Sequence, residues 1–265
     1  MSNLRIDKVI EELDRVLERA WDEEDRIGYF AALYRRVTVK VREGILTHGV
    51  FDDPERMDRL DEVFAHRFLD ALAAWQAGRP TSSCWEKAFE GARSWRPVIL
   101  QQLVLGINAH INLDLGVAAA RISPGDEIAS LHHDFNQINA ILFGLVNIVE
   151  RQVGEVSPWL GLLSRVAGED GVRAVEFSLS VARVEAWRFA EELAPVAEPD
   201  QAPRIERKDR EVTDLARLVL HPGWLIDAAL LLIRARESRD VRHVIDILSE
   251  ETAHVTELVD LAEEA

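Results

Sequence analysis

The chain has 265 residues, of which 48% are hydrophobic and 29% charged, and its formal net charge is −16. This composition excludes a disordered chain and is sufficient for a sizeable core. The acidic charge argues against nucleic acid and anionic membrane surfaces as partners, because both are bound through basic patches. The single cysteine, Cys84, excludes an internal disulfide, and the charged N-terminal stretch lacks the apolar core of a signal peptide. We therefore expect a cytoplasmic protein.

The first two predicted helices cover residues 6–21 and 27–45, where apolar residues recur at helical spacing on either side of an acidic break. The second helix carries Tyr34 and Thr38 on its apolar stripe, so both hydroxyls should point inward. They either bond to the neighbouring backbone or line a site. On the second interpretation, Tyr34 is a candidate substrate-binding residue.

A third helix is predicted over residues 55–77 and packs through Phe64 and Phe68. Asp61 shares this apolar stripe, where a carboxylate needs a partner or a raised pKa. We therefore expect Asp61 to be a buried acid that supports a site. The opposite face carries three residues spaced four apart, Glu62, His66 and Asp70. These look like a metal-binding row, but a solvated face with local ion pairs explains them better.

Residues 97–121, PVILQQLVLGINAHINLDLGVAAAR, predict a long helix that is apolar on nearly every side, as is typical of the centre of a bundle. Four polar residues occupy every second position within it: Asn108, His110, Asn112 and Asp114. At ~100° per residue, His110 and Asp114 share one face, and the two asparagines share the opposite one. Burying such groups without partners would cost roughly 1–3 kcal/mol each, so something must satisfy them.

The break after the central helix is short, so the next helix, about residues 126–153, should return antiparallel beside it. His133 lies on its polar side, and Asp134 lies at the border with its apolar stripe. That polar side faces either solvent or a cavity. In the second case both residues become candidate metal ligands.

A later helix, predicted over residues 171–196, places Arg183 and Trp187 one turn apart. They could bind an anionic or planar ligand by charge pairing and stacking. Alternatively, Arg183 pairs with an acid of its own helix and Trp187 belongs to the core. Further helices are predicted over residues 206–220 and 225–236 and from residue 240.

No segment alternates with period two, so the predicted fold class is all-α, a multi-helix bundle around the buried helix at residues 97–121. We expect one domain over residues 1–265. The sequence has no Gly-rich phosphate loop, no GxSxG or HExxH motif and no CxxC pair. Nucleotide and flavin cofactors are therefore not expected, whereas a divalent metal stays open.

His110 and Asp114 on one face of an apolar helix allow three interpretations. The acid could orient the imidazole and stabilise its charged form, which makes His110 a general acid/base. Both could instead bind a divalent metal that activates water, together with His133 and Asp134. Or the polar residues form a buried network that only fixes helix packing.

Two segments, INAHINLDL (107–115) and HHDFNQIN (132–139), resemble the signature of a bacterial all-helical family known as a domain of unknown function. The resemblance covers residues 25–220 and leaves residues 221–265 as a helical extension. It implies a shared polar set that consists of Asn108, His110, Asn112, Asp114, Asp134 and Asn139. Four further residues fit the same pattern: Tyr34, Asp61, Arg183 and Trp187. The resemblance implies no activity.

The hypothesis that follows is a small-molecule enzyme of the hydrolase, lyase or cyclase type that acts on an apolar substrate in a biosynthetic pathway. His110, Asp114 and Asp61 would be its catalytic residues. The residues expected to contact substrate are Tyr34, Asn108, Asn112, Arg183 and Trp187. Two other classes stay open, a non-catalytic protein that binds an apolar ligand and a helical interaction module. A homo-oligomer is compatible with each of them.

Overall fold

The computed structural model describes residues 4–159 and 171–250, and within these ranges every regular element is helical. The prediction of an all-α fold is therefore confirmed. The main helices are α1 (Arg5–Asp22), α2 (Ile27–Leu46), α3 (Pro54–Gln76), α4 (Ser83–Arg93), α5 (Ile99–Ala109), α6 (Gly116–Ile122), α7 (Ile128–Val156), α9 (Gly171–Leu193), α10 (Ala202–Leu220), α11 (Trp224–Arg236) and α12 (Val241–Ser249). Short 3-10 turns, η2 (Gly125–Glu127) and η3 (Glu198–Asp200), precede α7 and α10.

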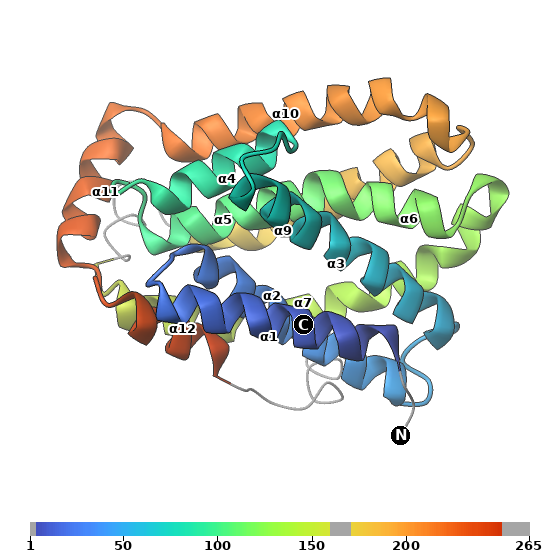
Figure 1. The fold of residues 1–265 in the computed structure, drawn as a ribbon, viewed down its shortest axis with the longest axis horizontal. Coiled ribbons are helices and arrows are strands. Elements are labelled where there is room, and N and C mark those ends of the chain that lie inside the picture. The colour runs from blue at the N-terminus through green and yellow to red at the C-terminus, as the bar shows by residue number, and fades with distance from the viewer. Residues whose placement is uncertain (1–3, 160–170, 251–265) are drawn as a thin grey trace.

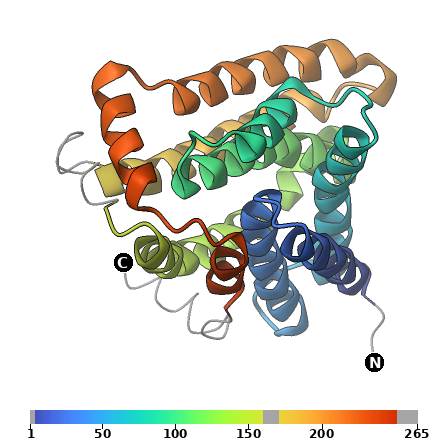
Figure 2. The same cartoon turned by 60° about the vertical axis from the view of Figure 1, so that its left-hand side comes forward.

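The helices surround one continuous central helix made of α5, the segment η1 (His110–Leu115) and α6 (Figure 1). On one side α4 and α10 pack against α5, and α9 packs against η1 and α6. On the other side lie α2 and α3, which α1 covers from outside. Helix α11 crosses one end of the molecule, as both views show (Figures 1 and 2).

The central helix is the most deeply buried element. Residues 99–122 are long and apolar enough to cross a membrane. An 18-residue window within them has a mean hydropathy of 1.4, but 83% of that window is buried within the fold. Apolar residues on all its sides meet neighbouring helices, which is why the sequence shows no polar stripe there. The prediction of a buried central helix is confirmed.

The middle of the central helix is not α-helical. Residues 110–115 form a π-helix, in which each N–H bonds five residues back instead of four. π-Helical segments are rare in proteins, and those that do occur are often found at functional sites. Glycines stand on both sides of this segment, where a Cβ on Gly106 would lie 2.4 Å from the Phe30 ring and one on Gly116 would lie 2.9 Å from the Ala186 carbonyl oxygen. The small residues thus let α2 and α9 approach the segment closely.

The predicted helix boundaries agree with the structure within a few residues, with one informative difference. Helix α10 begins at Ala202 rather than at residue 206, so Pro203 lies within its first turn. The first N–H groups of a helix have no intrahelical acceptor, so a proline is tolerated there. Pro203 therefore belongs to the helix, and the connection between α9 and α10 is shorter than the predicted boundaries imply.

Candidate functional site

His110 lies inside a group of aromatic side chains that we call the aromatic box. Its members are Phe30 and Tyr34 of α2, Phe64 and Phe68 of α3, and Trp85 of α4. The Phe64 ring stacks on the imidazole with 3.6 Å between centroids, and the Tyr34 ring meets it edge-on at 4.3 Å. Phe30 approaches a further edge at 5.7 Å. His110 is only 3% exposed, so apolar carbon surrounds the imidazole on most sides.

Several buried polar atoms in and beside the aromatic box have no hydrogen-bond partner among the described residues. They are both ring nitrogens of His110, the Tyr34 hydroxyl and the Oδ2 atom of Asp61. Thr38 does not share this state, because its hydroxyl donates to the Tyr34 carbonyl oxygen at 3.0 Å. An unsatisfied buried group costs about 1–3 kcal/mol, and most proteins avoid it. Ten further such atoms are spread over the other described residues, and the concentration of four at one place marks this box as the candidate site.

Asp114 comes next to His110 as the sequence predicted, but two other residues hold its carboxylate. Arg67 Nε donates to Oδ1 at 2.9 Å and Trp85 Nε1 donates to Oδ2 at 2.8 Å. The distance from His110 Nδ1 to Asp114 Oδ2 is 3.6 Å, which is longer than a hydrogen bond. Asp114 is fully buried, and the Arg67 guanidinium compensates its charge.

Burial changes the protonation of the site in opposite directions for its acid and its base. It lowers the pKa of His110, and this effect outweighs the nearby Asp114 carboxylate. Burial, with a smaller contribution from the Asp58 charge, raises the pKa of Asp61 to about 8. Burial and the Asp61 charge raise the pKa of the Tyr34 hydroxyl. At neutral pH the imidazole is therefore uncharged and Asp61 carries a proton. One of the three interpretations of the sequence instead had Asp114 stabilise a charged imidazole.

A cleft of about 490 Å³ opens on the outer side of α3. Arg67 and Trp85, the two donors to Asp114, form part of its lining, together with Arg121 of α6. Glu62, His66 and Asp70 also line this cleft, and the Glu62 carboxylate forms an ion pair with Arg5 at 2.8 Å. The solvated row of the sequence prediction is thus the outer wall of a cleft that approaches Asp114.

The two asparagines of the central helix are satisfied within the fold. Asn112 Nδ2 donates to Asn108 Oδ1 at 2.9 Å, and Asn108 Nδ2 donates to the Val212 carbonyl oxygen at 2.9 Å. Through these bonds the helix anchors α10. They were expected to contact substrate, and the structure places them in this anchoring contact.

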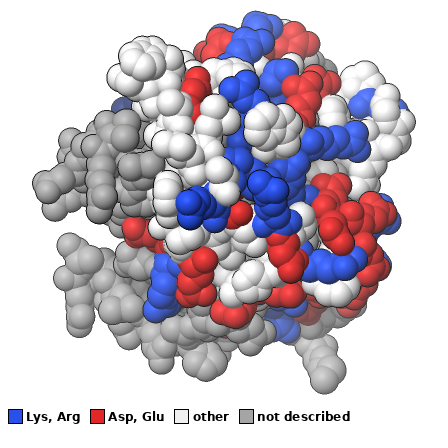
Figure 3. All heavy atoms as spheres, turned by 90° about the vertical axis from the view of Figure 1, so that its left-hand side faces the viewer, with Lys and Arg blue, Asp and Glu red and all other residues white. Residues whose placement is uncertain are grey.

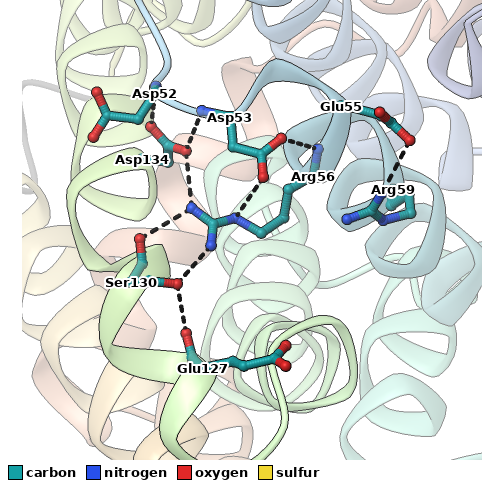
Figure 4. Close-up of polar contacts among 8 residues, drawn as sticks. All are labelled: Asp52, Asp53, Glu55, Arg56, Arg59, Glu127, Ser130 and Asp134. Atoms are coloured by element: carbon teal, nitrogen blue, oxygen red, sulfur yellow. Dashed lines mark hydrogen bonds and ion pairs between the residues drawn. The ribbon is translucent and has the colours of Figure 1, made fainter.

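Asp134 holds the connection between α2 and α3 (Figure 4). Its carboxylate accepts the backbone N–H groups of Asp52 at 2.6 Å and Asp53 at 3.0 Å, and the guanidinium of Arg56 lies 3.3 Å away. The same guanidinium donates to the hydroxyl of Ser130 at 2.7 Å and to its carbonyl oxygen at 3.0 Å. The role that these contacts support is the attachment of the loop to α7.

The four candidate metal ligands lie in two separate pairs, His110 with Asp114 and His133 with Asp134. Ligand atoms of Asp52, His133 and Asp134 lie within 4.8 Å of one another, and no such group among the described residues includes His110 or Asp114. A cation on Asp134 would meet the Arg56 guanidinium, and one on Asp114 would meet Arg67, whose charges oppose it. Of the two pairs, only the one with Asp134 belongs to a group of three candidate ligand residues among the described residues.

Arg183 and Trp187 lie between α9 and α7. The Arg183 guanidinium donates to the Phe135 carbonyl oxygen at 2.6 Å and lies 4.5 Å from the centroid of the Phe135 ring. Burial lowers the pKa of Arg183 to about 9. The Trp187 ring packs on Phe135 at 4.9 Å and on His132 at 4.6 Å. Both side chains thus contact α7, and among the described residues no ring contact or hydrogen bond joins either of them to the aromatic box.

Sequence reasoning missed Arg67, the indole donor of Trp85 and the π-helix. Arg67 directly precedes Phe68 on α3, so its place beside the apolar stripe was the available signal. Trp85 was visible only as an apolar residue of a short helix. The π-helix leaves no pattern in a single sequence, and it shifts every side chain that follows it relative to an ideal wheel.

Comparison with known proteins gives one match. A family model described as "Family of unknown function (DUF5995)" matches residues 6–222, which extends the expected range towards the N-terminus. No curated protein and no solved structure matches the chain.

Proposed function

Because the chain belongs to the DUF5995 family, whose description names no function, we propose one from the site: a small-molecule enzyme that moves protons on an apolar substrate. One observation carries the proposal. The ring nitrogens of His110, the Tyr34 hydroxyl and Asp61 Oδ2 are buried in and beside one aromatic box, and none of them has a hydrogen-bond partner among the described residues. A reaction of the hydrolase, lyase or cyclase type would use such groups.

The division of roles follows from the environments of the two titratable groups. His110, which burial keeps uncharged, accepts a proton from the substrate, and protonated Asp61 donates one. The Tyr34 hydroxyl is free to donate a hydrogen bond to an oxygen on which negative charge develops. Asp114, at 3.6 Å, stabilises the imidazolium that forms. Arg67 and Trp85 are positioning residues, because they fix the Asp114 carboxylate.

Access to His110 requires one side chain to move. Phe64 covers the imidazole by stacking on it and is the partly exposed member of the box, whereas Tyr34, Phe68 and Trp85 are buried. A rotation of the Phe64 ring would open a slot of aromatic width between α2 and α3. A planar apolar substrate could replace the ring and keep the same stacking contact.

The aromatic walls also favour a second candidate, a protein that holds an apolar ligand in the box without converting it. Binding sites of this kind are mostly apolar with a few polar groups that orient the ligand. The two candidates differ in the need for His110, because a binding protein requires its shape and an enzyme requires its ring nitrogen.

The test compares three proteins on the same mixture of small metabolites from a cell extract, with consumption followed by mass spectrometry. They are the wild type, His110→Gln and the control His243→Gln, which alters an exposed histidine of α12. We expect a metabolite that the wild type and the control convert and that His110→Gln leaves intact. Equal conversion by all three proteins would refute the role of His110. A metabolite that the wild type retains unchanged would support the binding protein instead.

A further inference from the structure

The outer face of α11 is apolar and exposed over three turns. It consists of Trp224, Leu225, Ala228, Leu231, Leu232 and Ala235. Trp224 is 78% exposed, Leu225 57% and Leu232 54%. The opposite face of the same helix packs on Val98 through Leu230 and Ile233. Within the described part of the chain, helix α11 is therefore apolar on two faces and packs through only one of them.

Charged residues flank this face without entering it. Asp227 stands near the start of the helix and Arg234 and Arg236 near its end. Arg234 donates to the carbonyl oxygen of Trp95, whose ring is also exposed. Figure 3 shows, at this end of the molecule, an uncharged area that lies beside a central group of Lys and Arg side chains. An uncharged centre with a charged border and exposed tryptophans is typical of a protein interface.

The pattern along the face is complementary to itself. Leu225, Ala228, Leu232 and Ala235 follow the three-four-three spacing of a helix–helix seam and alternate large with small side chains. In an antiparallel pair of α11 helices related by a two-fold axis at residue 230, Leu225 faces the partner's Ala235 and Ala228 faces the partner's Leu232. Each layer then holds one leucine and one alanine, which lets the two helices pack closely.

Aromatic and basic side chains border the two ends of the seam. On the same axis, Trp224 lies on one border and the partner's Arg236 lies in the same layer on the other border. Each end of the seam therefore has an exposed indole on one side and a guanidinium on the other, as is usual at the rim of a protein interface.

We propose that a second copy of this chain covers the outer face of α11 and forms a two-fold symmetric dimer through an antiparallel α11 pair. This arrangement is isologous, so it closes at two copies and does not form a chain of subunits. Residues 224–236 lie beyond the part that the family model matches. The dimer is independent of the proposed chemistry at His110.

Sedimentation velocity tests the proposal on the full chain. We expect a dimer for the wild type, and Leu232→Glu should raise its dissociation constant by about 30-fold or more, because a central leucine of the seam becomes charged. The matched control is Leu46→Glu, which alters a leucine of α2 that is 49% exposed and should leave the dimer intact. A monomeric wild type, or equal dimers in both variants, would overturn the proposal. A monomer that binds vesicles of phosphatidylglycerol and phosphatidylcholine through α11 would assign the face to a membrane instead.

Cysteine cross-linking tests the direction and register of the pair. Ala228→Cys and Leu232→Cys are made in separate chains, and Cys84 stays buried in both. An equimolar mixture should form intermolecular disulfides several-fold more readily than either variant alone, because residue 228 faces the partner's residue 232. Equal cross-linking in all three samples would contradict the antiparallel register. Sedimentation of the reduced variants shows that each still dimerises.

Discussion

The Tyr34→Phe variant should be more stable than the wild type. Tyr34 is 4% exposed and its hydroxyl has no hydrogen-bond partner among the described residues, so folding removes that hydroxyl from water without compensation. The penalty for such a group is about 1–3 kcal/mol, and phenylalanine keeps the ring contacts with His110 and Phe30. We expect the free energy of unfolding to rise by about 1–2 kcal/mol, which is roughly 2–5 °C in Tm for a chain of this size.

Urea and thermal unfolding, followed by far-UV circular dichroism, measure this change. The matched control is Thr38→Val, one turn along the same helix, where the lost hydroxyl does have an acceptor. That variant should lose about 0.5–1.5 kcal/mol. If Tyr34→Phe raises the free energy of unfolding and Thr38→Val lowers it, the Tyr34 hydroxyl is a group that the protein retains at a cost in stability, as is common at functional sites. A Tyr34→Phe variant destabilised by as much as Thr38→Val would refute the reasoning, because the hydroxyl would then have a structural partner.

Three further predictions concern the same site. Folded Asp61, with a pKa of about 8, keeps a proton that the unfolded chain loses near pH ~4, so stability should fall as pH rises between these values, by up to about 1.4 kcal/mol per pH unit. In urea unfolding at several pH values, Asp61→Asn should lack this decline, and identical profiles would contradict the raised pKa. Arg67→Met leaves the buried Asp114 without its cation and should lower the unfolding free energy by about 3 kcal/mol, whereas an unchanged midpoint would show that the pair is dispensable. Phe64→Ala should increase acylation of His110 by diethyl pyrocarbonate several-fold by peptide mass spectrometry, and an unchanged yield would mean that another side chain covers the imidazole.

The fold was predictable because apolar residues recur at helical spacing in nearly every segment. The central helix was recognisable from the same physics, since a helix surrounded by other helices has no polar face. Pro203 shows the limit of this reasoning, because a proline is allowed in the first turn and a sequence pattern does not distinguish that position from a linker.

The candidate site was predictable in its polar residues and not in its partners. Asp61 and Tyr34 stood out because a carboxylate and a hydroxyl on apolar stripes are expensive to bury. Arg67 and Trp85 did not, since an arginine beside a stripe and a tryptophan on it have ordinary explanations. Which donors reach Asp114 depends on how three helices meet, and that is long-range information absent from local spacing.

The sign of the His110 pKa shift also required the structure. An acid one turn away made a stabilised imidazolium one of the three interpretations of the sequence. In the structure, Arg67 and Trp85 bind the carboxylate of Asp114, and aromatic rings enclose the imidazole. Desolvation then outweighs the remaining attraction. The difference decides the chemistry, because an uncharged imidazole is available as a base and a charged one is not.

The protonation state of His110 tests the central claim most directly. Nitrogen-15 NMR of the imidazole, assigned by comparison with His110→Gln, reports its charge across a pH titration. The account predicts an uncharged ring at pH ~6.5, where an unperturbed histidine is half protonated. An imidazole that is fully charged at that pH would instead form an ion pair with Asp114, as the interpretation of a purely structural network requires. That result would contradict the role of His110 as a base.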